Sequence, residues 1–276
     1  MRILFIGDVV GRAGVNAVLS YLPPLLTDWQ IDCAVVNGEN SADGGFGITE
    51  TSFRELRAAG IDAVTLGNHS WNRKEALTLI EHEPCLIRPI NYNSSVPGQG
   101  STLITVNGGR RVLVINALGR LFMDPVNDPF QAISQAIEAY PLGREADAII
   151  VDMHCEATSE KHVTGHLFDG RVSLVVGTHT HVPTADHQIL PNGTAFISDV
   201  GMTGDYDSIA GMQKEEPIRR FTTGIPHWKY EPAIGAATLS GIAVETDDHN
   251  GLALKVAPVR IGGRLQGALP NFWISE

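Results

Sequence analysis

Short apolar runs recur along the chain, and most of them end in a glycine or a polar residue. This pattern restricts the fold more than any other feature of the sequence. Six of the runs are brief and rich in Val and Ile, which is typical of strands buried on both faces. They cover residues 3–6, 33–36, 63–66, 112–116, 148–151 and 173–176. Amphipathic stretches lie between them, and strands that alternate with helices predict an α/β protein with a largely parallel sheet.

The amphipathic stretches carry recognisable helix signals. Apolar residues recur at helical spacing over residues 15–22, after which Pro23–Pro24 predict a break or a kink. Ser52 and Glu55 have the spacing of a capping box, and Gly60 is the expected end of the helix that follows. These signals predict helices that cover the sheet.

The C-terminal third has a different pattern. Residues 188–198 predict a hairpin around a Pro-Asn-Gly turn, and residues 237–245 and 252–259 predict a second hairpin. Antiparallel strands are therefore expected to join the parallel set and give mixed sheets. Because no repeat, low-complexity tract or linker-like change in composition interrupts the chain, residues 1–276 are expected to form a single domain.

Charge and cysteine content exclude several classes of protein. The 20 Lys and Arg residues against 31 Asp and Glu give a net charge of −11, which argues against a large binding surface for duplex DNA. A small anionic substrate stays open, since bound metal ions reverse the local field. No run reaches the roughly 18–20 apolar residues of a membrane span. Three cysteines without CxxC spacing do not form a disulfide framework, so a cytoplasmic protein without membrane attachment is expected.

The residues that follow the predicted strands point to a metal site. They are Asp8, Glu39, Asn40, Asn68, His69, His154, His179 and His181. In an open parallel sheet, ligands bind outside the carboxyl ends of the strands, so these side chains are expected to meet at one edge. Oxygen and nitrogen donors suit Mn, Fe or Zn. His179 and His181 would point to the same side if the backbone between them were extended.

The segments around these residues resemble a known family. Gly67-Asn-His69, Gly177-Thr-His-Thr-His181 and Gly7-Asp8 are similar to the signature blocks of calcineurin-like metallophosphoesterases. Within that superfamily, Asn40 and residues 154–161 resemble the YmdB-like branch, which is associated with bacterial 2′,3′-cyclic-nucleotide 2′-phosphodiesterases. The resemblance implies a four-layer α/β/β/α sandwich with two metal ions at one end, Fe or Mn in the first place, with Zn or Mg as alternatives.

The resemblance also implies two sets of metal ligands. Metal one would take Asp8, Glu39, Asn40 and His181. Metal two would take Glu39, Asn68, His154 and His179. The chain departs from the superfamily pattern because Val9-Val10 follow Asp8 in place of the usual Asp-x-His, and because a glutamate, Glu39, replaces the usual bridging aspartate. Asn40 is then the expected replacement donor.

The implied reaction is hydrolysis of a 2′,3′-cyclic nucleotide. A hydroxide shared by the two metals would attack phosphorus, and His69 would protonate the leaving ribose oxygen as general acid. A hydrogen bond to a ligand carboxylate is the alternative role of His69. Asp152 and Glu156 are candidates for orienting His154 or a neighbour, or are ordinary surface carboxylates.

Two other functions stay open at this stage. One is a phosphomonoesterase or protein phosphatase on the same scaffold. The other is a metal-dependent regulatory or RNA-binding protein with vestigial hydrolysis. The expected partner is a small nucleotide or phosphodiester, and the sequence leaves open whether the chain forms a homo-oligomer.

Several basic and aromatic residues near these segments allow two interpretations. The basic residues are interpreted either as phosphate contacts or as surface charges; they are Arg12, Arg73 and Lys161. The aromatic residues are interpreted either as base-stacking or as packing residues; they are Phe46, Trp71 and Tyr206.

Overall fold

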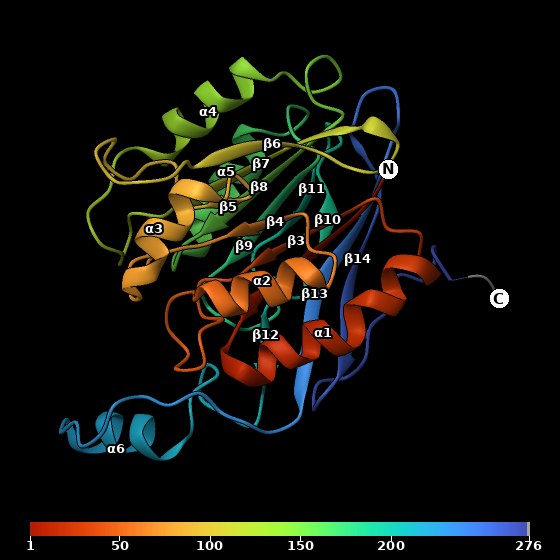
Figure 1. Ribbon diagram of the computed structural model, residues 1–276. Coiled ribbons are helices and arrows are strands. Elements are labelled where there is room, and N and C mark those ends of the chain that lie inside the picture. The colour runs from red at the N-terminus through yellow and green to blue at the C-terminus, as the bar shows by residue number, and fades with distance from the viewer. Residues whose placement is uncertain (275–276) are drawn as a thin grey trace.

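The computed structural model describes residues 1–274, in which two mixed β-sheets pack face to face between outer layers of helices (Figure 1). The first sheet has the order β2-β12-β13-β1-β3-β4-β5, with β14 paired to β13. Its strands are β1 (Arg2–Ile6), β2 (Asp8–Val9), β3 (Cys33–Asn37), β4 (Ala63–Thr65), β5 (Leu86–Ile87), β12 (Met202–Asp205), β13 (Ala237–Thr246) and β14 (Ala253–Gly262).

The second sheet has the order β10-β11-β9-β8-β7-β6. Its strands are β6 (Ser101–Thr105), β7 (Arg111–Leu118), β8 (Ala148–His154), β9 (Leu174–Thr178), β10 (Gln188–Ile189) and β11 (Ala195–Ile197). The helices are α1 (Gly11–Asp28), α2 (Glu50–Ala58), α3 (Lys74–His82), α4 (Pro129–Ala139), α5 (Thr158–Leu167) and α6 (Glu215–Thr223), with a 3₁₀ turn at Asn107–Gly109.

Apolar side chains fill the space between the sheets. Phe5 and Val35 of the first sheet belong to one fully buried cluster with Val114, Ile150 and Val176 of the second. The opposite faces of the same strands pack against helices. These strands are therefore buried on both sides, which explains why the sequence shows continuous apolar runs there instead of an alternation.

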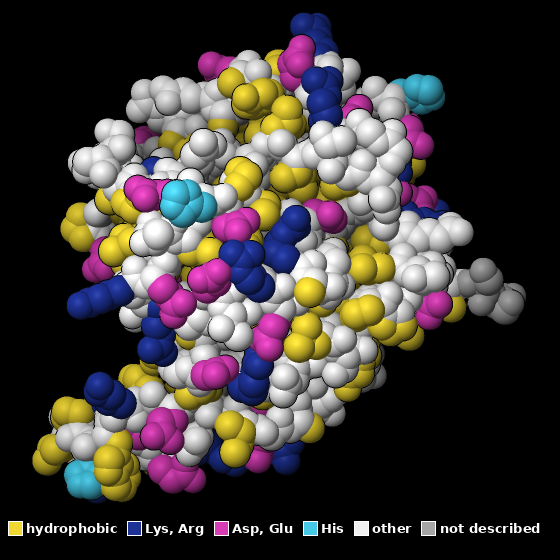
Figure 2. Space-filling view, in the orientation of Figure 1, with side chains coloured by type: hydrophobic (Ala, Val, Ile, Leu, Met, Phe, Trp, Pro, Cys, Tyr) yellow, Lys and Arg dark blue, Asp and Glu magenta, His cyan; other side chains and the backbone are white. Residues whose placement is uncertain are grey.

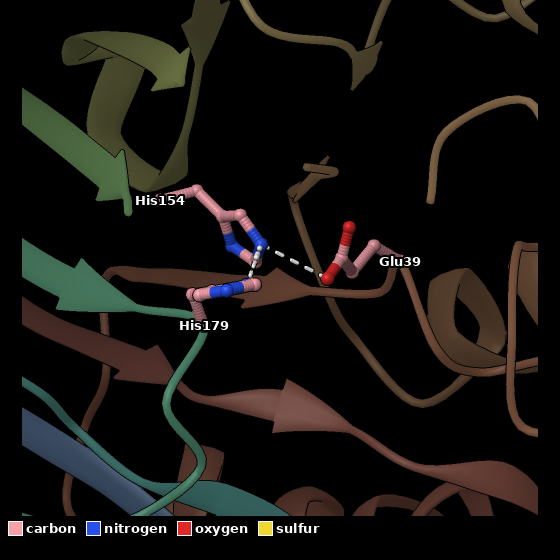
Figure 3. A group of neighbouring side chains, drawn as sticks. All are labelled: Glu39, His154 and His179. Atoms are coloured by element: carbon pink, nitrogen blue, oxygen red, sulfur yellow. Dashed lines mark hydrogen bonds and ion pairs between the residues drawn. The ribbon is translucent and has the colours of Figure 1, made fainter. Parts of the chain in front are cut away.

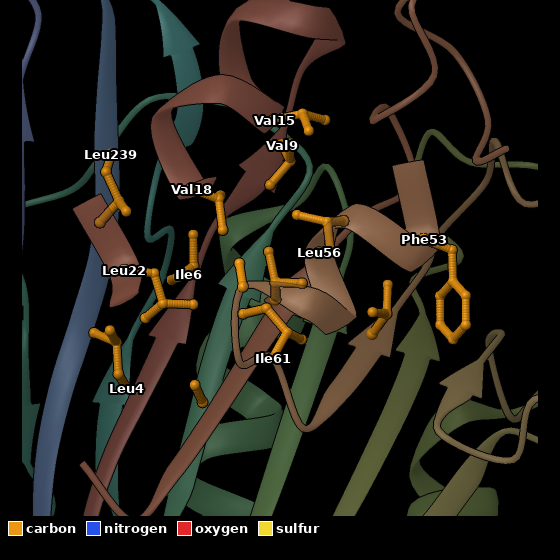
Figure 4. Close-up of a cluster of buried hydrophobic side chains, with 14 of the residues drawn as sticks. Leu4, Ile6, Val9, Val15, Val18, Leu22, Phe53, Leu56, Ile61 and Leu239 are labelled. Carbon is orange, nitrogen blue, oxygen red and sulfur yellow. The ribbon is translucent and has the colours of Figure 1, made fainter. Parts of the chain in front are cut away.

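Helices cover the outer face of each sheet. On the first sheet, Val18 and Leu22 of α1 and Leu56 of α2 pack over Leu4 and Ile6 of β1 (Figure 4). The cluster on the second sheet includes Leu113, Ile115, Ile133, Ile137 and Phe168. The expected four-layer α/β/β/α sandwich with mixed sheets is confirmed.

All six strands predicted from the apolar runs form, and of the two outcomes predicted for Pro23–Pro24, a break or a kink, the break does not occur. Helix α1 continues through Pro23 and Pro24 to Asp28. A proline inside a helix removes a hydrogen bond and crowds the preceding turn. Here the fully buried face that includes Val15 and Leu22 holds the helix on the sheet across that point.

The second helix begins one turn earlier than predicted. Its N-cap is Thr49, whose side chain accepts a hydrogen bond from the Ser52 amide, while the Ser52 hydroxyl accepts one from the Thr49 amide. The pairing of Ser52 with Glu55 as a capping box was therefore wrong. Gly60 follows the end of the helix with a φ of 103°, in the left-handed region that favours glycine, as expected.

The C-terminal third forms the two predicted hairpins. Strands β10 and β11 pair antiparallel, and so do β13 and β14. Strand β13 also pairs antiparallel with β1, which places a strand from the C-terminal third beside the first strand in the middle of the first sheet. Strand β12 pairs in parallel with β2, where Met202 lies opposite Asp8.

A segment between β12 and β13 leaves the body of the sandwich. Residues 206–236, which we call the α6 arm, carry helix α6 and project from the lower left of the molecule in Figure 1. Bridges of Met212 to Ile209 and Pro232 close the stem of the arm. No helix among residues 1–274 is both long and apolar enough to cross a membrane.

Candidate metal centre

The side chains singled out at the strand ends meet at one edge of the two sheets. Asp8 follows β1, Glu39 and Asn40 follow β3, and Asn68 and His69 follow β4 in the first sheet. From the second sheet, His154 ends β8, and His179 and His181 follow β9. The strand ends of the two sheets lie close together: His154 of the second sheet is within hydrogen-bond distance of Glu39 of the first. Donors from both sheets therefore line one site.

One part of this site centres on His154, and we call Glu39, Asn68, His154 and His179 the His154 half. His154 Nε2 lies 2.9 Å from Glu39 Oε1, 3.0 Å from Asn68 Oδ1 and 3.1 Å from His179 Nδ1. Figure 3 shows the rings of His154 and His179 turned toward the carboxylate of Glu39. Atoms that carry lone pairs repel one another at this spacing unless a proton or a cation lies among them. Ligand atoms of Glu39, His154 and His179 all lie within 4.8 Å of one another, close enough to hold one metal ion.

A hydrogen-bond relay beneath the site fixes the His154 ring. Thr178 Oγ1 donates to Asp152 Oδ1 at 2.6 Å, so its oxygen is free to accept from His154 Nδ1 at 2.8 Å. Thr65 and Asn37 donate to the other oxygen of the same carboxylate at 2.5 and 3.0 Å. With its Nδ1 proton engaged in the relay, His154 presents the Nε2 lone pair to the site. Asp152 thus orients His154, one of the two roles considered from the sequence.

The second part of the site, Asp8, Asn40 and His181, has looser contacts, and we call it the Asp8 half. Asp8 Oδ1 lies 3.7 Å from His181 Nε2 and 3.8 Å from His154 Nδ1. Asn40 Nδ2 lies 3.3 Å from both Glu39 Oε1 and His181 Nε2. Glu39 Oε1 therefore touches a member of each half.

Two buried oxygens in the Asp8 half have no hydrogen-bond partner among residues 1–274. They are Asp8 Oδ1 and Asn40 Oδ1. A buried oxygen without a partner costs free energy, so such atoms call for a ligand. His181 Nδ1 donates to the carbonyl of Ala210 at 2.9 Å, which leaves its Nε2 lone pair facing the same place. A set of carboxylate, amide and imidazole donors that includes two unpartnered oxygens fits a metal ion of the Mn, Fe or Zn type.

The segment that carries His179 and His181 is not extended, so the condition under which both rings would point to one side is not met. Both residues have positive φ values, 95° and 64°, which are unusual for residues other than glycine and often mark functional sites. Between them, Thr180 donates its amide and its hydroxyl to Asp199 Oδ2 at 3.1 and 2.7 Å. The turn sends His179 to the His154 half and His181 to the Asp8 half.

Lys161 holds this turn from below. Its side chain is fully buried, and Nζ donates to Asp199 Oδ2 at 2.8 Å. Neither interpretation made from the sequence, a phosphate contact or a surface charge, was correct. A buried ammonium needs such a partner, because removing either charge would leave the other one uncompensated.

The charges around the site favour a bound cation. Burial disfavours the charged form of Glu39, but His154 and His69 outweigh it and lower the pKa of the carboxyl to about 2. Burial also opposes a charge on His154, yet Glu39, Asp8 and Asp152 raise the pKa of its imidazole to about 9. The field at His154 therefore favours positive charge. His179 is partly buried beside it, and this desolvation together with the positive charge of His154 lowers its pKa to about 3, so the His179 imidazole stays neutral, the form that binds metals.

His69 lies at the edge of the centre. Its backbone amide donates to Glu39 Oε2 at 2.9 Å, while its ring packs against Phe46 with the centroids 4.8 Å apart. The His69 side chain lines a cavity. Asn68 places its Oδ1 beside His154 Nε2, whereas the His69 ring makes no comparable contact with either half among the described residues. Glu156 reaches the centre from outside, with Oε2 3.3 Å from His179 Nε2.

A cavity of about 250 Å³ opens beside the metal donors. Its lining residues are Glu39, Asn40, Phe46, His69, His179, His181, Ile209, Ala210, Met212, Pro217, Phe221 and Tyr230. The last six come from the α6 arm, and the sequence reasoning missed all of them. No periodic pattern or spacing connects them to the ligand segments, so only the fold reveals them.

The basic and aromatic candidates from the sequence mostly have other partners. Arg12 pairs with Glu55, and Arg73 Nε donates to the carbonyl of Phe46. Trp71 packs near Tyr92 with the ring centroids 6.1 Å apart. The Tyr206 hydroxyl donates to the Met202 carbonyl. Of the three aromatic candidates, Phe46 is the one that lines the cavity.

Comparisons with known proteins agree with this architecture. The chain is 46% identical, over 95% of its length and 97% of the other protein, to a Bacillus subtilis protein named 2′,3′-cyclic-nucleotide 2′-phosphodiesterase. A solved structure of a hypothetical protein from Thermus thermophilus superposes with a TM-score of 0.88 at 42% identity, covering 96% of this chain and 100% of that one. A structure described as a novel phosphatase from Mycoplasma pneumoniae gives a TM-score of 0.87 at 34% identity, covering 99% and 95%.

The family model described as YmdB-like protein matches residues 4–259. This match includes every candidate metal donor described above. With these relatives, it shows that the chain belongs to the YmdB-like family.

Proposed function

We propose that the chain is a metal-dependent phosphodiesterase that hydrolyses 2′,3′-cyclic nucleotides. The observation that carries the proposal is the convergence of Glu39, Asn68 and His179 donor atoms on His154 Nε2, beside a cavity that His69 also lines. The name of the Bacillus subtilis relative supplies the substrate class.

The donor sets would hold two metal ions. Glu39, Asn68, His154 and His179 would bind one ion, and Asp8, Glu39, Asn40 and His181 the other. Fe and Mn suit this mixture of nitrogen and oxygen donors, with Zn and Mg as alternatives. Bound ions would neutralise charge on the phosphate and lower the pKa of a water molecule, so that hydroxide is available near neutral pH.

The protein residues have distinct tasks in the reaction. The oxygen of water forms a bond to phosphorus while the bond from phosphorus to the ribose 2′ oxygen breaks, which leaves a 3′-monophosphate. The departing 2′ oxygen needs a proton, and His69 supplies it because its side chain lines the cavity beside Glu39. Phe46 packs against the His69 ring and restricts its orientation.

The test combines metal analysis with a panel of phosphate esters. We expect metal-containing protein to convert 2′,3′-cyclic AMP to 3′-AMP, to act more slowly on 3′,5′-cyclic AMP, and to lose activity with a chelator until metal is returned. Faster hydrolysis of p-nitrophenyl phosphate than of any diester would instead identify a phosphatase. Full metal content without hydrolysis of any ester would favour a regulatory or RNA-binding role.

We also propose that residues 1–276 act as one domain in the cytoplasm. Within residues 1–274, the core between the sheets joins strands from both ends of the chain, as with Phe5 and Ile242. Cys33, Cys85 and Cys155 are free thiols, which suits a reducing compartment. Intact-mass measurement after thiol alkylation in denaturant without reductant would count three modified cysteines if this is correct; denaturant is needed because Cys33 and Cys155 are buried.

A further inference from the structure

The α6 arm presents large apolar side chains to solvent. Phe221 is 86% exposed, Ile234 is 82% exposed, and Trp228 and Ile225 are each more than half exposed. In the space-filling view, the lobe that contains α6 shows apolar patches among charged side chains (Figure 2). Single exposed apolar residues are common, but an exposed phenylalanine that also lines the cavity of the candidate centre calls for an explanation.

The cavity has two chemically different ends. Glu39, Asn40, His179 and His181 form a polar end made of metal donors. Pro217, Phe221 and Tyr230 contribute an apolar wall from the arm. A ligand that fills both ends must join a charged group to a flat apolar one over a short distance. A nucleotide does so, because the ribose connects its phosphate to its base.

We propose that Phe221 and Tyr230 form the base-binding face of the site, on which the base of the substrate stacks while its phosphate lies at the metal donors. This inference rests on the function proposed above and names the residues that recognise the nucleoside part of the substrate. Bases stack on aromatic side chains in many nucleotide-binding proteins, and stacking accepts every base since each has a π-face.

The Tyr230 ring is already held in place. The guanidinium of Arg220 lies 4.1 Å from its centroid, within the range of a cation–π contact. Glu216 fixes Arg220 through a 2.6 Å contact from Arg220 Nε, and the Trp228 carbonyl accepts from the same guanidinium. A ring that is fixed before binding loses little side-chain entropy when the base arrives.

The arm also contacts the centre directly. His181 Nδ1 donates to the carbonyl of Ala210, which lies in the stem of the arm. The base-binding face is therefore tied to a metal donor through one hydrogen bond and a short stretch of chain. A substrate that bridges the two ends would meet both without a large movement of the arm.

Specificity follows from the composition of this wall. The arm residues at the apolar end offer few polar atoms to read the edge of a base, so we expect all four 2′,3′-cyclic nucleotides to be accepted. Purines should bind somewhat better than pyrimidines because they stack over a larger area.

The test uses two five-membered cyclic phosphodiesters on the metal-containing protein. One is 2′,3′-cyclic AMP, and the other is glycerol 1,2-cyclic phosphate, which has the same reacting group without a base. We expect Phe221→Ala to raise KM for 2′,3′-cyclic AMP by about 10- to 100-fold with little change in kcat, and to leave kcat/KM for the glycerol ester unchanged. Phe221→Trp should keep the wild-type KM, and Phe221→Leu should restore it only in part, because leucine is apolar but not planar.

Ile218→Ala is the matched control. Ile218 is an exposed apolar residue on the same helix, but it does not line the cavity. Its substitution should leave kcat and KM unchanged for both substrates. Equal losses on both substrates in Phe221→Ala would overturn the proposal and assign the arm a structural role. An unchanged KM for 2′,3′-cyclic AMP would overturn it as well.

A binding measurement separates this inference from the proposed function. Adenosine has the base and ribose but no phosphate, and calorimetry should detect its binding to wild type and to Ile218→Ala but not to Phe221→Ala. If wild type hydrolyses neither diester, the proposed function fails. The adenosine measurement alone then decides whether Phe221 and Tyr230 form a base-binding face. Equal adenosine affinity in wild type and Phe221→Ala would reject that face whatever the catalytic result.

Discussion

The His154 half and the Asp8 half of the candidate metal centre lie side by side, but they are held in different ways. In the His154 half, the ring of His154 is fixed through Thr178 by a buried carboxylate, and three donor atoms lie within about 3 Å of its Nε2. In the Asp8 half, the contacts are longer, and one oxygen each of Asp8 and Asn40 is buried without a hydrogen-bond partner in the described part of the chain.

This difference predicts unequal metal affinities. The donors of the His154 half already lie close together, so binding an ion there requires little rearrangement. The Asp8 half contains an amide in the place expected for a stronger imidazole donor, and its free oxygens gain a partner only when a ligand arrives. We therefore expect the His154 half to fill at lower metal concentration. The following variants test the comparison by affecting both halves, neither half, or one of them.

The largest effect is expected from the residue that touches both halves. Glu39→Gln removes the negative charge next to His154 and Asn40, so both ions should bind weakly. Phosphodiesterase activity should be nearly abolished, a larger loss than the ~10²–10⁴-fold that general acid catalysis contributes. Metal analysis and circular dichroism would check this, with Glu83→Gln as a control far from the centre. Wild-type metal content in Glu39→Gln would remove Glu39 from its proposed position between the ions.

His69→Ala should spare both halves and still impair catalysis. General acid catalysis typically contributes ~10²–10⁴-fold, and it matters most when the leaving group is poor. Hydrolysis of 2′,3′-cyclic AMP should therefore slow by that range, whereas bis-p-nitrophenyl phosphate, with its good leaving group, should lose much less. Metal content should remain near that of wild type. Loss of a metal would instead make His69 a ligand and require a new assignment of the donors.

Asp152→Asn should affect the His154 half alone. The amide cannot match the carboxylate as an acceptor for Thr178, so the His154 ring loses its fixed tautomer. We expect metal affinity in that half to fall by ~10–100-fold, and the second metal to be retained. Thr65→Val is the matched control, because it removes a hydrogen bond to the other oxygen of Asp152 and leaves Thr178 in place. A titration that gives equal metal affinities for these two variants would contradict the relay.

The smallest effect is expected from Asn40→Ala, which should weaken the Asp8 half. Activity should drop by about tenfold at limiting metal, and excess metal should restore part of it. Asn40→Asp keeps an oxygen at the same position and should retain both ions. If the metal titration of Asn40→Ala matches that of wild type, the unpaired Oδ1 of Asn40 is not a donor.

The sequence was sufficient for the parts of this site that depend on local patterns. Each ligand candidate follows a short apolar run, and strand ends are easy to locate when the runs are bounded by glycine, as at Gly7 and Gly67. The signature segments resemble those of metallophosphoesterases, and this resemblance implied that two packed sheets bring the strand ends together.

Contacts between distant segments could not be predicted. The relay from Asp152 to Thr178 depends on the register between β8 and β9, in which Asp152 lies opposite Val176. Lys161 is buried because Asp199, on another segment, neutralises it. The cavity wall was missed for the same reason, since Phe221 and Tyr230 lie in a segment with no regular apolar spacing and face the centre only because the stem of the arm directs them there.

The position of β13 has a consequence for how the protein is made. β13 pairs with β1 along five consecutive residue positions, although almost the whole chain separates the two strands. During synthesis, every candidate metal donor from Asp8 to His181 is made before β13 exists, while one edge of β1 still lacks its partner. The first sheet can close only after synthesis reaches residue 246, and pairing over such a separation is intrinsically slow. Nascent chains therefore pass through a stage in which all candidate metal donors are present but the sheet that supports four of the seven is still open, so the candidate centre should be completed only after β13 has paired with β1.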